Sequence, residues 1–522
     1  MKPCIGRAVR RYFAPAVLLF SLLPTLWAQG LDYIKAHYAK SEYKIPMRDN
    51  AQLLTAVYAP KDTSRQYPIM LTRTPYSIVP YGVENYPRSL GPSERFAREG
   101  FIFAYQDVRG RMMSEGEFIN VRPYKPAKGP GEIDESTDTY DTIGWLVKHI
   151  PNNNGRVGMW GVSYPGFYVA VGMIDAHPAL KAASPQAPIA DWFMGDDFHH
   201  NGALYLPHAF NFLALFGRPR TGPSTSFPPL FQHGTPDGYA FFLRMGPLPN
   251  ANAKYFHNEI AFWNDLMQHG TYDAFWQARN LRPHLKNIRP AVMTVGGWFD
   301  AEDLFGALHV YQSVEKSSPA AFNVLVMGPW PHGGWSRTDG EALGHVRFGS
   351  KTGVFYRDEI EFPFFNHHLK GAGELRLPEA HVFETGSNQW RQYDSWPPKN
   401  TVATNIYFHE GGKLSFEPAG TSSSSAFDEY VSDPAKPVPY INGTAINMTQ
   451  EHMVEDQRFA SRRPDVLVYQ TEELAADITV AGPIVPSLHV STSGTDSDWV
   501  VKLIDVYPDN TPDNQPNPMQ FR

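Results

Sequence analysis

The chain has 522 residues, of which 42% are hydrophobic and 14% aromatic, and its formal net charge is −7. This length and composition indicate a globular protein with two to four domains and exclude a chain without a packed core. Residues 1–28 carry four positive charges and no negative ones, so their removal would take the net charge from −7 to −11. Such a negative balance excludes nucleic acid as a partner.

The first 28 residues are typical of a cleavable secretory signal. Basic residues precede an apolar stretch over residues 12–27, which Pro15 and Pro24 interrupt, and Ala28 suits the cleavage site. A membrane anchor is the alternative, but the stretch is shorter than the ~20 residues of a spanning helix, so we expect no stable membrane insertion. We expect a periplasmic or secreted protein. The single cysteine, Cys4, lies in the removed segment, so the mature chain would form no disulfide.

Short apolar runs then alternate with helix-compatible segments over residues 29–190. This alternation predicts a doubly wound α/β sheet, and the fold class that we expect is α/β. Two further apolar runs, at 291–295 and 324–327, indicate that the same domain resumes over residues 286–372. The first set of predicted elements comprises strands at 53–58, 69–72, 101–105 and 157–160 and a helix at 137–148.

Two other regions interrupt or follow this sheet. Residues 191–285 lose the strand rhythm and are rich in aromatic and helix-compatible residues, which predicts a helical cap over the carboxyl ends of the strands. Residues 373–522 contain short apolar runs at 406–408, 466–469 and 499–504 among Pro, Gly, Ser and Asp turns. This pattern predicts an all-β domain, a jelly-roll sandwich that ends early.

A serine stands between the strand at 157–160 and the helix that follows it. Residues 161–166 read Gly-x-Ser-x-x-Gly, with Ser163 flanked by Gly161 and Gly166. A sharp turn from strand to helix can present a serine hydroxyl as a nucleophile, and the glycines leave room for the close approach of strand and helix. The pattern alone is weak evidence, because a chain with 42 glycines produces it by chance.

A serine nucleophile needs a histidine base and a carboxylate that orients it. Asp300 follows the strand at 291–295, and His332 follows the strand at 324–327, in the chain order of α/β-hydrolases. Alone, Asp300 would be interpreted as a helix N-cap and His332 as a loop histidine. Their joint order and placement favour a catalytic triad of Ser163, Asp300 and His332.

These motifs together resemble the superfamily of X-Pro dipeptidyl peptidases, cocaine esterase and α-amino acid ester hydrolases. The resemblance covers nearly the whole mature chain and implies an α/β-hydrolase with a helical cap and a C-terminal jelly roll. It also implies an oxyanion hole formed by the backbone N–H of Tyr164 and the hydroxyl of Tyr76. The stretches that carry the resemblance are 107–111, 114–116, 161–166, 195–197, 298–303, 328–332 and 499–507.

Within that superfamily, Asp197, Glu302 and Asp303 resemble the carboxylate cluster of α-amino acid ester hydrolases. Clustered carboxylates repel one another unless a cation joins them, and the protonated α-amino group of a substrate is such a cation. The alternative is that Glu302 and Asp303 complement a helix N-terminus and that Asp196 or Asp197 pairs with a nearby arginine or histidine. The candidate histidines are His199 and His200.

The resulting hypothesis is a serine hydrolase or acyltransferase that cleaves esters or amides of α-amino acids, including β-lactam-type acyl donors, through an acyl-enzyme. No metal or organic cofactor is needed, the partner is a small-molecule substrate, and relatives suggest a homo-oligomer. The alternatives are an X-Pro dipeptidyl peptidase, a glutaryl-cephalosporin-type acylase and a general carboxylesterase. A jelly-roll carbohydrate-binding protein is the alternative that is not an enzyme.

Overall fold

The structure is a computed structural model that describes residues 30–420 and 427–508. The predicted signal peptide, including Cys4, lies outside these residues. Within the described ranges, none of the helices has the length and apolar character needed to cross a membrane.

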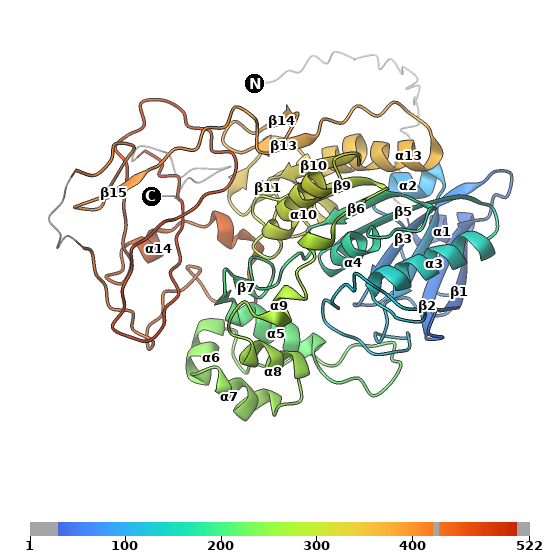
Figure 1. The fold of residues 1–522 in the computed structure, drawn as a ribbon, viewed down its shortest axis with the longest axis horizontal. Coiled ribbons are helices and arrows are strands. Elements are labelled where there is room, and N and C mark those ends of the chain that lie inside the picture. The colour runs from blue at the N-terminus through green and yellow to red at the C-terminus, as the bar shows by residue number, and fades with distance from the viewer. Residues whose placement is uncertain (1–29, 421–426, 509–522) are drawn as a thin grey trace, which may run out of the picture.

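A ten-stranded sheet forms the centre of the molecule, in the order β1-β2-β4-β3-β5-β6-β9-β10-β13-β14 (Figure 1). The strands from β4 to β13 are parallel, and β1, β2 and β14 pair antiparallel at the two edges. The predicted α/β class is confirmed. The strands are β1 (Tyr38–Pro46), β2 (Gln52–Pro60), β3 (Tyr67–Thr74), β4 (Ile102–Asp107), β5 (Asn153–Val162), β6 (Leu180–Gln186), β9 (Ala291–Gly297), β10 (Asn323–Gly328), β13 (Ala380–Glu384) and β14 (Gln389–Tyr393).

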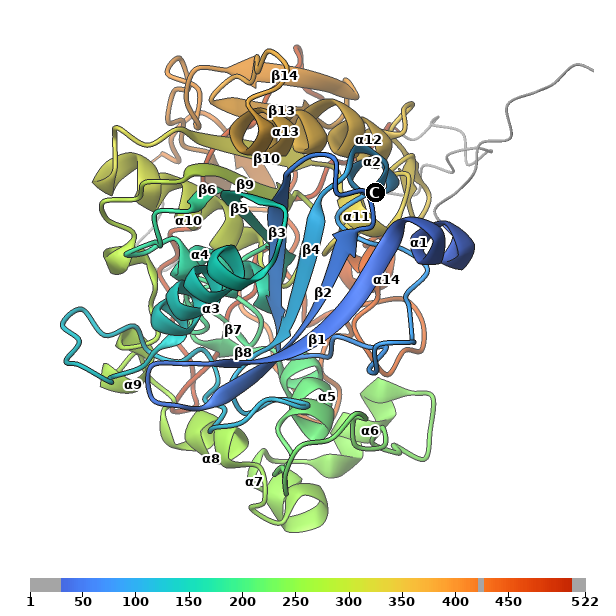
Figure 2. The ribbon, with the colours of Figure 1, turned by 90° about the vertical axis from the view of Figure 1, so that its right-hand side faces the viewer.

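Both faces of the sheet are covered, because successive side chains of a strand point to opposite faces. On β3, Ile69 and Leu71 pack into the cluster that contains α3 and α4, whereas Met70 packs into the cluster of α2 and α13. Figure 2 shows α3 and α4 on one side of the strands and α1 and α2 on the other. The helices of this domain are α1 (Leu31–His37), α2 (Glu94–Glu99), α3 (Glu135–His149), α4 (Tyr164–Gly172), α10 (Leu304–Ser317), α11 (Gly334–Arg337), α12 (Thr352–Phe355), η3 (Tyr356–Glu361) and α13 (Phe362–Lys370).

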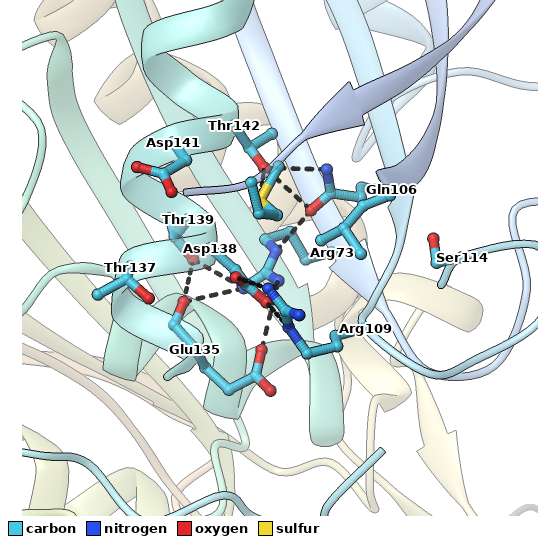
Figure 3. A network of polar contacts seen from close by, with 12 residues as sticks. Arg73, Gln106, Arg109, Ser114, Glu135, Thr137, Asp138, Thr139, Asp141 and Thr142 are labelled. Carbon is cyan, nitrogen blue, oxygen red and sulfur yellow. Dashed lines mark hydrogen bonds and ion pairs between the residues drawn. The ribbon is translucent and has the colours of Figure 1, made fainter. Parts of the chain in front are cut away.

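A buried network of charges ties the end of β3 to α3 (Figure 3). Arg73 is fully buried, and its Nε donates a hydrogen bond to Gln106 Oε1 at 2.8 Å. Its Nη1 donates to Thr139 Oγ1 at 2.8 Å, and its Nη2 lies 3.3 Å from Glu135 Oε2 and 3.7 Å from Asp138 Oδ2. Since a buried charge requires such partners, the network fixes the strand end from which the chain runs on to Tyr76.

The chain between β6 and β9 forms the expected helical cap, which Figure 1 shows beside the sheet. Its core is aromatic: Phe210 contacts Phe241, Phe256 and Trp263, with ring centroids 4.5–6.0 Å apart. The cap elements are β7 (His199–His200), β8 (Ala203–Leu204), α5 (Leu206–Phe216), α6 (Gly238–Met245), α7 (Pro249–Ala251), η1 (Asn252–Phe256), α8 (Ala261–Gln268), α9 (Ala274–Gln277) and η2 (Arg282–His284).

The C-terminal region differs from the sequence prediction. Strands β13 and β14, beyond the predicted boundary at 373, extend the central sheet. In the described residues after β14, only β15 (Tyr407–His409) and β16 (Lys413–Ser415) pair, and a single bridge links Lys413 to Gln470. The remaining elements of the chain are β11 (Ala342–Leu343), β12 (Val346–Arg347), η4 (Gln450–Val454) and α14 (Arg458–Ser461).

In the part of the chain that the structure describes, this region thus contains one short hairpin, and the jelly roll stays a prediction. The segments 466–469 and 499–504, which were expected to be strands, lack ladder partners. Their apolar side chains gain no buried face, as shown by Val500, which is 79% exposed, and Leu503, which is 64% exposed. A strand is stable only when its backbone groups pair and one of its faces is covered, and apolar composition alone provides neither.

Candidate active site

Ser163 occupies a strained turn between β5 and α4, as the glycine pattern predicts. Its φ is +69°, a conformation that side chains rarely adopt and that often marks a functional residue. Its N–H donates to the carbonyl oxygen of Gln186 at 2.9 Å. A Cβ on Gly166 would lie 2.4 Å from that same oxygen, and one on Gly161 would lie 2.6 Å from Pro165 Cβ. Close packing therefore requires both glycines and holds the serine at the carboxyl edge of the sheet.

Asp300 and His332 are in contact at the same edge. Asp300 follows β9, and its Oδ1 accepts hydrogen bonds from the N–H groups of Glu302 at 2.9 Å and Asp303 at 3.0 Å. Its Oδ2 lies 2.9 Å from Nδ1 of His332, which follows β10. The Asp300 carboxylate therefore accepts hydrogen bonds from a backbone turn and also contacts the imidazole. The capping role and the predicted catalytic role belong to the same buried side chain.

The second nitrogen of His332 faces a carboxylate. His332 Nε2 lies 3.5 Å from Glu302 Oε2. Burial lowers the pKa of His332, but the charges of Asp300, Glu302 and Asp197 and the hydrogen bond from Asp300 outweigh it and raise that pKa to about 9. The Ser163 hydroxyl forms no hydrogen bond within the described ranges. Hydrogen bonds between nucleophile and base often tighten only when substrate is bound.

The two residues that were predicted to form an oxyanion hole, Tyr164 and Tyr76, lie next to each other. Tyr164 is the first residue of α4, so its N–H has no intrahelical partner. Its own hydroxyl is engaged, because it accepts from the N–H of Val121 at 2.8 Å and donates to Asn120 Oδ1 at 3.2 Å. The ring of Tyr76 packs edge-on against that of Tyr164, 6.3 Å away. Burial, reinforced by the charge of Asp197, raises the pKa of Tyr76 well above its ordinary value, so its hydroxyl remains a neutral donor.

Asp197 lies beside Glu302, as expected for a carboxylate cluster. The N–H of Asp197 donates to the backbone oxygen of Glu302 at 2.9 Å, and its Oδ2 accepts from Trp192 Nε1 at 2.7 Å. Its Oδ1 lies 3.0 Å from Nε2 of His208, a residue of the cap helix α5. The sequence interpretation anticipated a histidine partner but not this one, because the position of α5 over the sheet leaves no signal in the local sequence.

Two further aspartates near the site, Asp303 and Asp196, differ in their hydrogen bonds. Asp303 is fully buried, and neither of its carboxyl oxygens has a hydrogen-bond partner in the described chain. Burial and the surrounding carboxylates raise the pKa of Asp303 well above its ordinary value, which favours its neutral form. Asp196 has a structural role, since its carboxylate accepts hydrogen bonds from three backbone N–H groups. These belong to Ala190, Asp191 and Gly306.

The site offers one place for a cation. One ligand atom from each of Asp197, His208 and Glu302 lies within 4.8 Å of the other two. An ammonium group or another small cation could bind between these side chains. The cluster adjoins His332 through Glu302, so a cation held there would lie next to this imidazole.

The C-terminal segment also reaches this site, which the sequence did not reveal. A small cavity beside His332 and Glu302 is bounded on its other side by residues at and before η4. His452 of this segment lies 3.5 Å from the hydroxyl of Tyr205 in the cap. The residues that line the cavity are Phe299, Ala301, Glu302, Pro331, His332, Met448, Thr449, Gln450 and His452.

A sequence model of the X-Pro dipeptidyl-peptidase (S15) family matches residues 49–334, more than half of the chain. The chain belongs to the S15 family. A second model, of the C-terminal non-catalytic domain of X-Pro dipeptidyl-peptidase, matches residues 373–518 of this S15 protein. The fold, the site and the family together make it a serine hydrolase of the esterase and peptidase class.

Individual relatives agree with this assignment. The S15 protein is 28% identical to cocaine esterase from Rhodococcus sp. (strain MB1 Bresler) over 494 residues, which cover 90% of this chain and 80% of the relative. It is 34% identical to an α-amino acid ester hydrolase of known structure, with a TM-score of 0.77 and coverage of 88% and 76%. An aminopeptidase from a marine sediment Thaumarchaeota archaeon is 35% identical, with a TM-score of 0.76 and coverage of 90% and 74%.

Proposed function

We propose that this protein cleaves esters or amides of α-amino acids through an acyl-enzyme on Ser163. The observation that carries the proposal is the position of Glu302, whose carboxylate lies 3.5 Å from Nε2 of His332. Because Nδ1 faces Asp300, Nε2 is the nitrogen that would accept the serine proton. A substrate cation bound at Glu302 and Asp197 would place its neighbouring carbonyl beside the base.

The chemistry follows from the placement of each group. His332 Nε2 takes the proton of the Ser163 hydroxyl while the serine oxygen bonds to the acyl carbon. Asp300 holds the imidazole and stabilises its charged form. The N–H of Tyr164 and the hydroxyl of Tyr76 stabilise the oxyanion of the tetrahedral intermediate. The imidazolium then protonates the leaving alcohol or amine, and water or the amine of a β-lactam nucleus resolves the acyl-enzyme.

Charge explains why an α-amino group would matter. A cation between carboxylates relieves their repulsion, whereas an uncharged acyl group gains nothing there. The cation would also oppose protonation of the nearby His332 and so favour the neutral imidazole that acts as the base. Selectivity and activation of the base would thus depend on the same interaction.

The relatives support this proposal and also favour a second candidate. An α-amino acid ester hydrolase and an aminopeptidase, both at least 34% identical, carry names that refer to substrates with an α-amino group. The family description instead names an X-Pro dipeptidyl-peptidase, whose peptide substrates would also present a cationic N-terminus. The carboxylate cluster is compatible with both reactions.

A substrate series tests the proposal. We expect kcat/KM for an α-amino acid ester to exceed that for its des-amino analogue by at least tenfold, roughly the effect of one charge-assisted contact. The variant Glu302→Gln should reduce this ratio, whereas Glu341→Gln, at an exposed loop carboxylate, should leave it unchanged.

Equal rates for the two esters would contradict the proposal and favour a general carboxylesterase. Faster cleavage of an Ala-Pro anilide than of any amino ester would favour the dipeptidyl peptidase. Preference for a glutaryl amide would favour the acylase. Binding of oligosaccharide without any hydrolysis would favour the carbohydrate-binding alternative.

A further inference from the structure

His208 places a basic side chain inside the proposed ammonium site. It extends from the cap helix α5, its side chain is 16% exposed, and its Nε2 lies 3.0 Å from Asp197 Oδ1. The other oxygen of Asp197 accepts from the indole N–H of Trp192 at 2.7 Å. Both oxygens of Asp197 are therefore engaged by the protein itself, and a substrate cation must compete for them.

The surroundings of His208 favour its charged form. Burial lowers the pKa of His208, but the hydrogen bond to Asp197 and the charges of Glu302 and Asp197 outweigh burial and the repulsion from His332, so that this pKa is raised. The rings packed around the imidazole carry no formal charge at neutral pH. They are Phe198, Tyr205 and Phe212, and His200 is a further titratable neighbour.

We propose that His208 is a specificity-determining residue, an internal cation that competes with the substrate ammonium group for Asp197. This inference rests on the proposed function. When the imidazolium pairs with Asp197, the pocket holds one negative charge fewer, so an ammonium group binds more weakly than the carboxylates alone would allow. This competition does not affect the binding of an acyl group without an amine. His208 thus limits the preference for amino-bearing substrates without taking part in the acyl transfer.

The test compares kcat/KM for matched amino and des-amino esters at one pH in the full-length protein. His208→Gln retains an N–H donor near the position of Nε2 but removes the charge. We expect it to raise the ratio of amino to des-amino activity about fivefold to tenfold, mainly through a lower KM for the amino ester. His208→Lys retains a cation and should hold the ratio at or below that of the parent.

Two controls separate competition from a structural effect on the cap. His233→Gln changes another cap histidine, whose Nε2 lies 2.8 Å from Asn211 Oδ1, and should leave the ratio unchanged. In an Asp197→Asn background, His208→Gln should no longer raise the ratio, because the competed carboxylate is gone. If His208 had only a structural role, His208→Gln would change KM and kcat for both esters alike, and it would do so in the Asp197→Asn background as well.

The outcomes distinguish this inference from the proposed function. A parent ratio near one would overturn the proposed function and this inference together. A high parent ratio that His208→Gln does not raise would overturn the role of His208 alone. If His208→Gln fails to fold, the lysine variant still decides, because a ratio above that of the parent in His208→Lys is incompatible with a competing cation.

Discussion

At the scale of single residues, we expect the charge state of His332, the proposed base, to govern activity. The base must be neutral to accept the serine proton, and neighbouring carboxylates stabilise its protonated form. Glu302 is the closest of these carboxylates to the reacting nitrogen Nε2. In the proposed function it therefore has opposing effects, because it would attract a cationic substrate and it raises the pKa of His332.

We predict that Glu302→Gln shifts the acidic limb of the pH profile to lower pH. In the parent, kcat/KM for an uncharged ester should rise with pH, and the midpoint of this rise should lie near the pKa of His332, about 9. Loss of the negative charge destabilises the imidazolium, lowers this pKa, and should move the limb down by about one pH unit. Glu341→Gln is the matched control, and a limb that stays in place or moves upward would refute the role of Glu302.

At the scale of elements, the turn between β5 and α4 holds Ser163, the proposed nucleophile. The sequence predicts this turn, because the glycine pattern and the flanking apolar runs are local properties. The buried runs of β3, β5, β9 and β10 are also predictable from the sequence, and the observed strands extend them by only a few residues. The order of residues 163, 300 and 332 along the parallel strands then places all three at one edge of the sheet.

We predict that Gly166→Ala lowers the free energy of unfolding by about 1–3 kcal/mol. The added Cβ would lie 2.4 Å from the carbonyl oxygen of Gln186, which also receives the N–H of Ser163. Activity should fall as well, because the turn must shift. Gly270→Ala, where an added Cβ meets nothing within 4 Å, is the control in denaturant titrations. Unchanged stability in Gly166→Ala would show that the turn is not tightly packed.

The charge network beneath β3 gives a second prediction at this scale. Arg73→Met removes one of the cations that face Glu135 and Asp138, which keep only Arg122 and Arg109, and should lower the free energy of unfolding by about 3–5 kcal/mol. Arg376→Met, which breaks an exposed ion pair with Glu374, should have little effect in the same denaturant titration. Equal midpoints for the two variants would contradict a structural role of the network.

At the scale of the whole molecule, distant segments complete the site. His208 comes from the cap, and the residues around η4 come from the C-terminal segment. The sequence predicts a cap over the carboxyl ends of the strands, but not that His208 would face Asp197 or that η4 would reach the site, because hydrophobic periodicity does not indicate which side chains a cap or a tail brings to a sheet. The jelly roll stays a prediction for a related reason: apolar runs form strands only where partners are available.

We predict that Val454→Asp detaches η4 from the site. Val454 is 8% exposed and packs with Leu343, Phe348 and Phe383, so a buried carboxylate there would be unpaired. Loss of this contact should remove the wall of the cavity beside His332 and raise KM about threefold to tenfold with a smaller effect on kcat. Val431→Asp, at a residue that is 81% exposed, is the control. Unchanged kinetics in Val454→Asp would show that η4 plays no part in substrate binding.

The central claim is that Ser163 is the nucleophile of this site. Labelling with a fluorophosphonate, followed by mass spectrometry of the intact protein and its peptides, tests it most directly. We predict one adduct per chain, on the peptide that contains Ser163, which is lost in Ser163→Ala and strongly slowed in His332→Ala. An adduct on another serine, or undiminished labelling of Ser163→Ala, would contradict the claim.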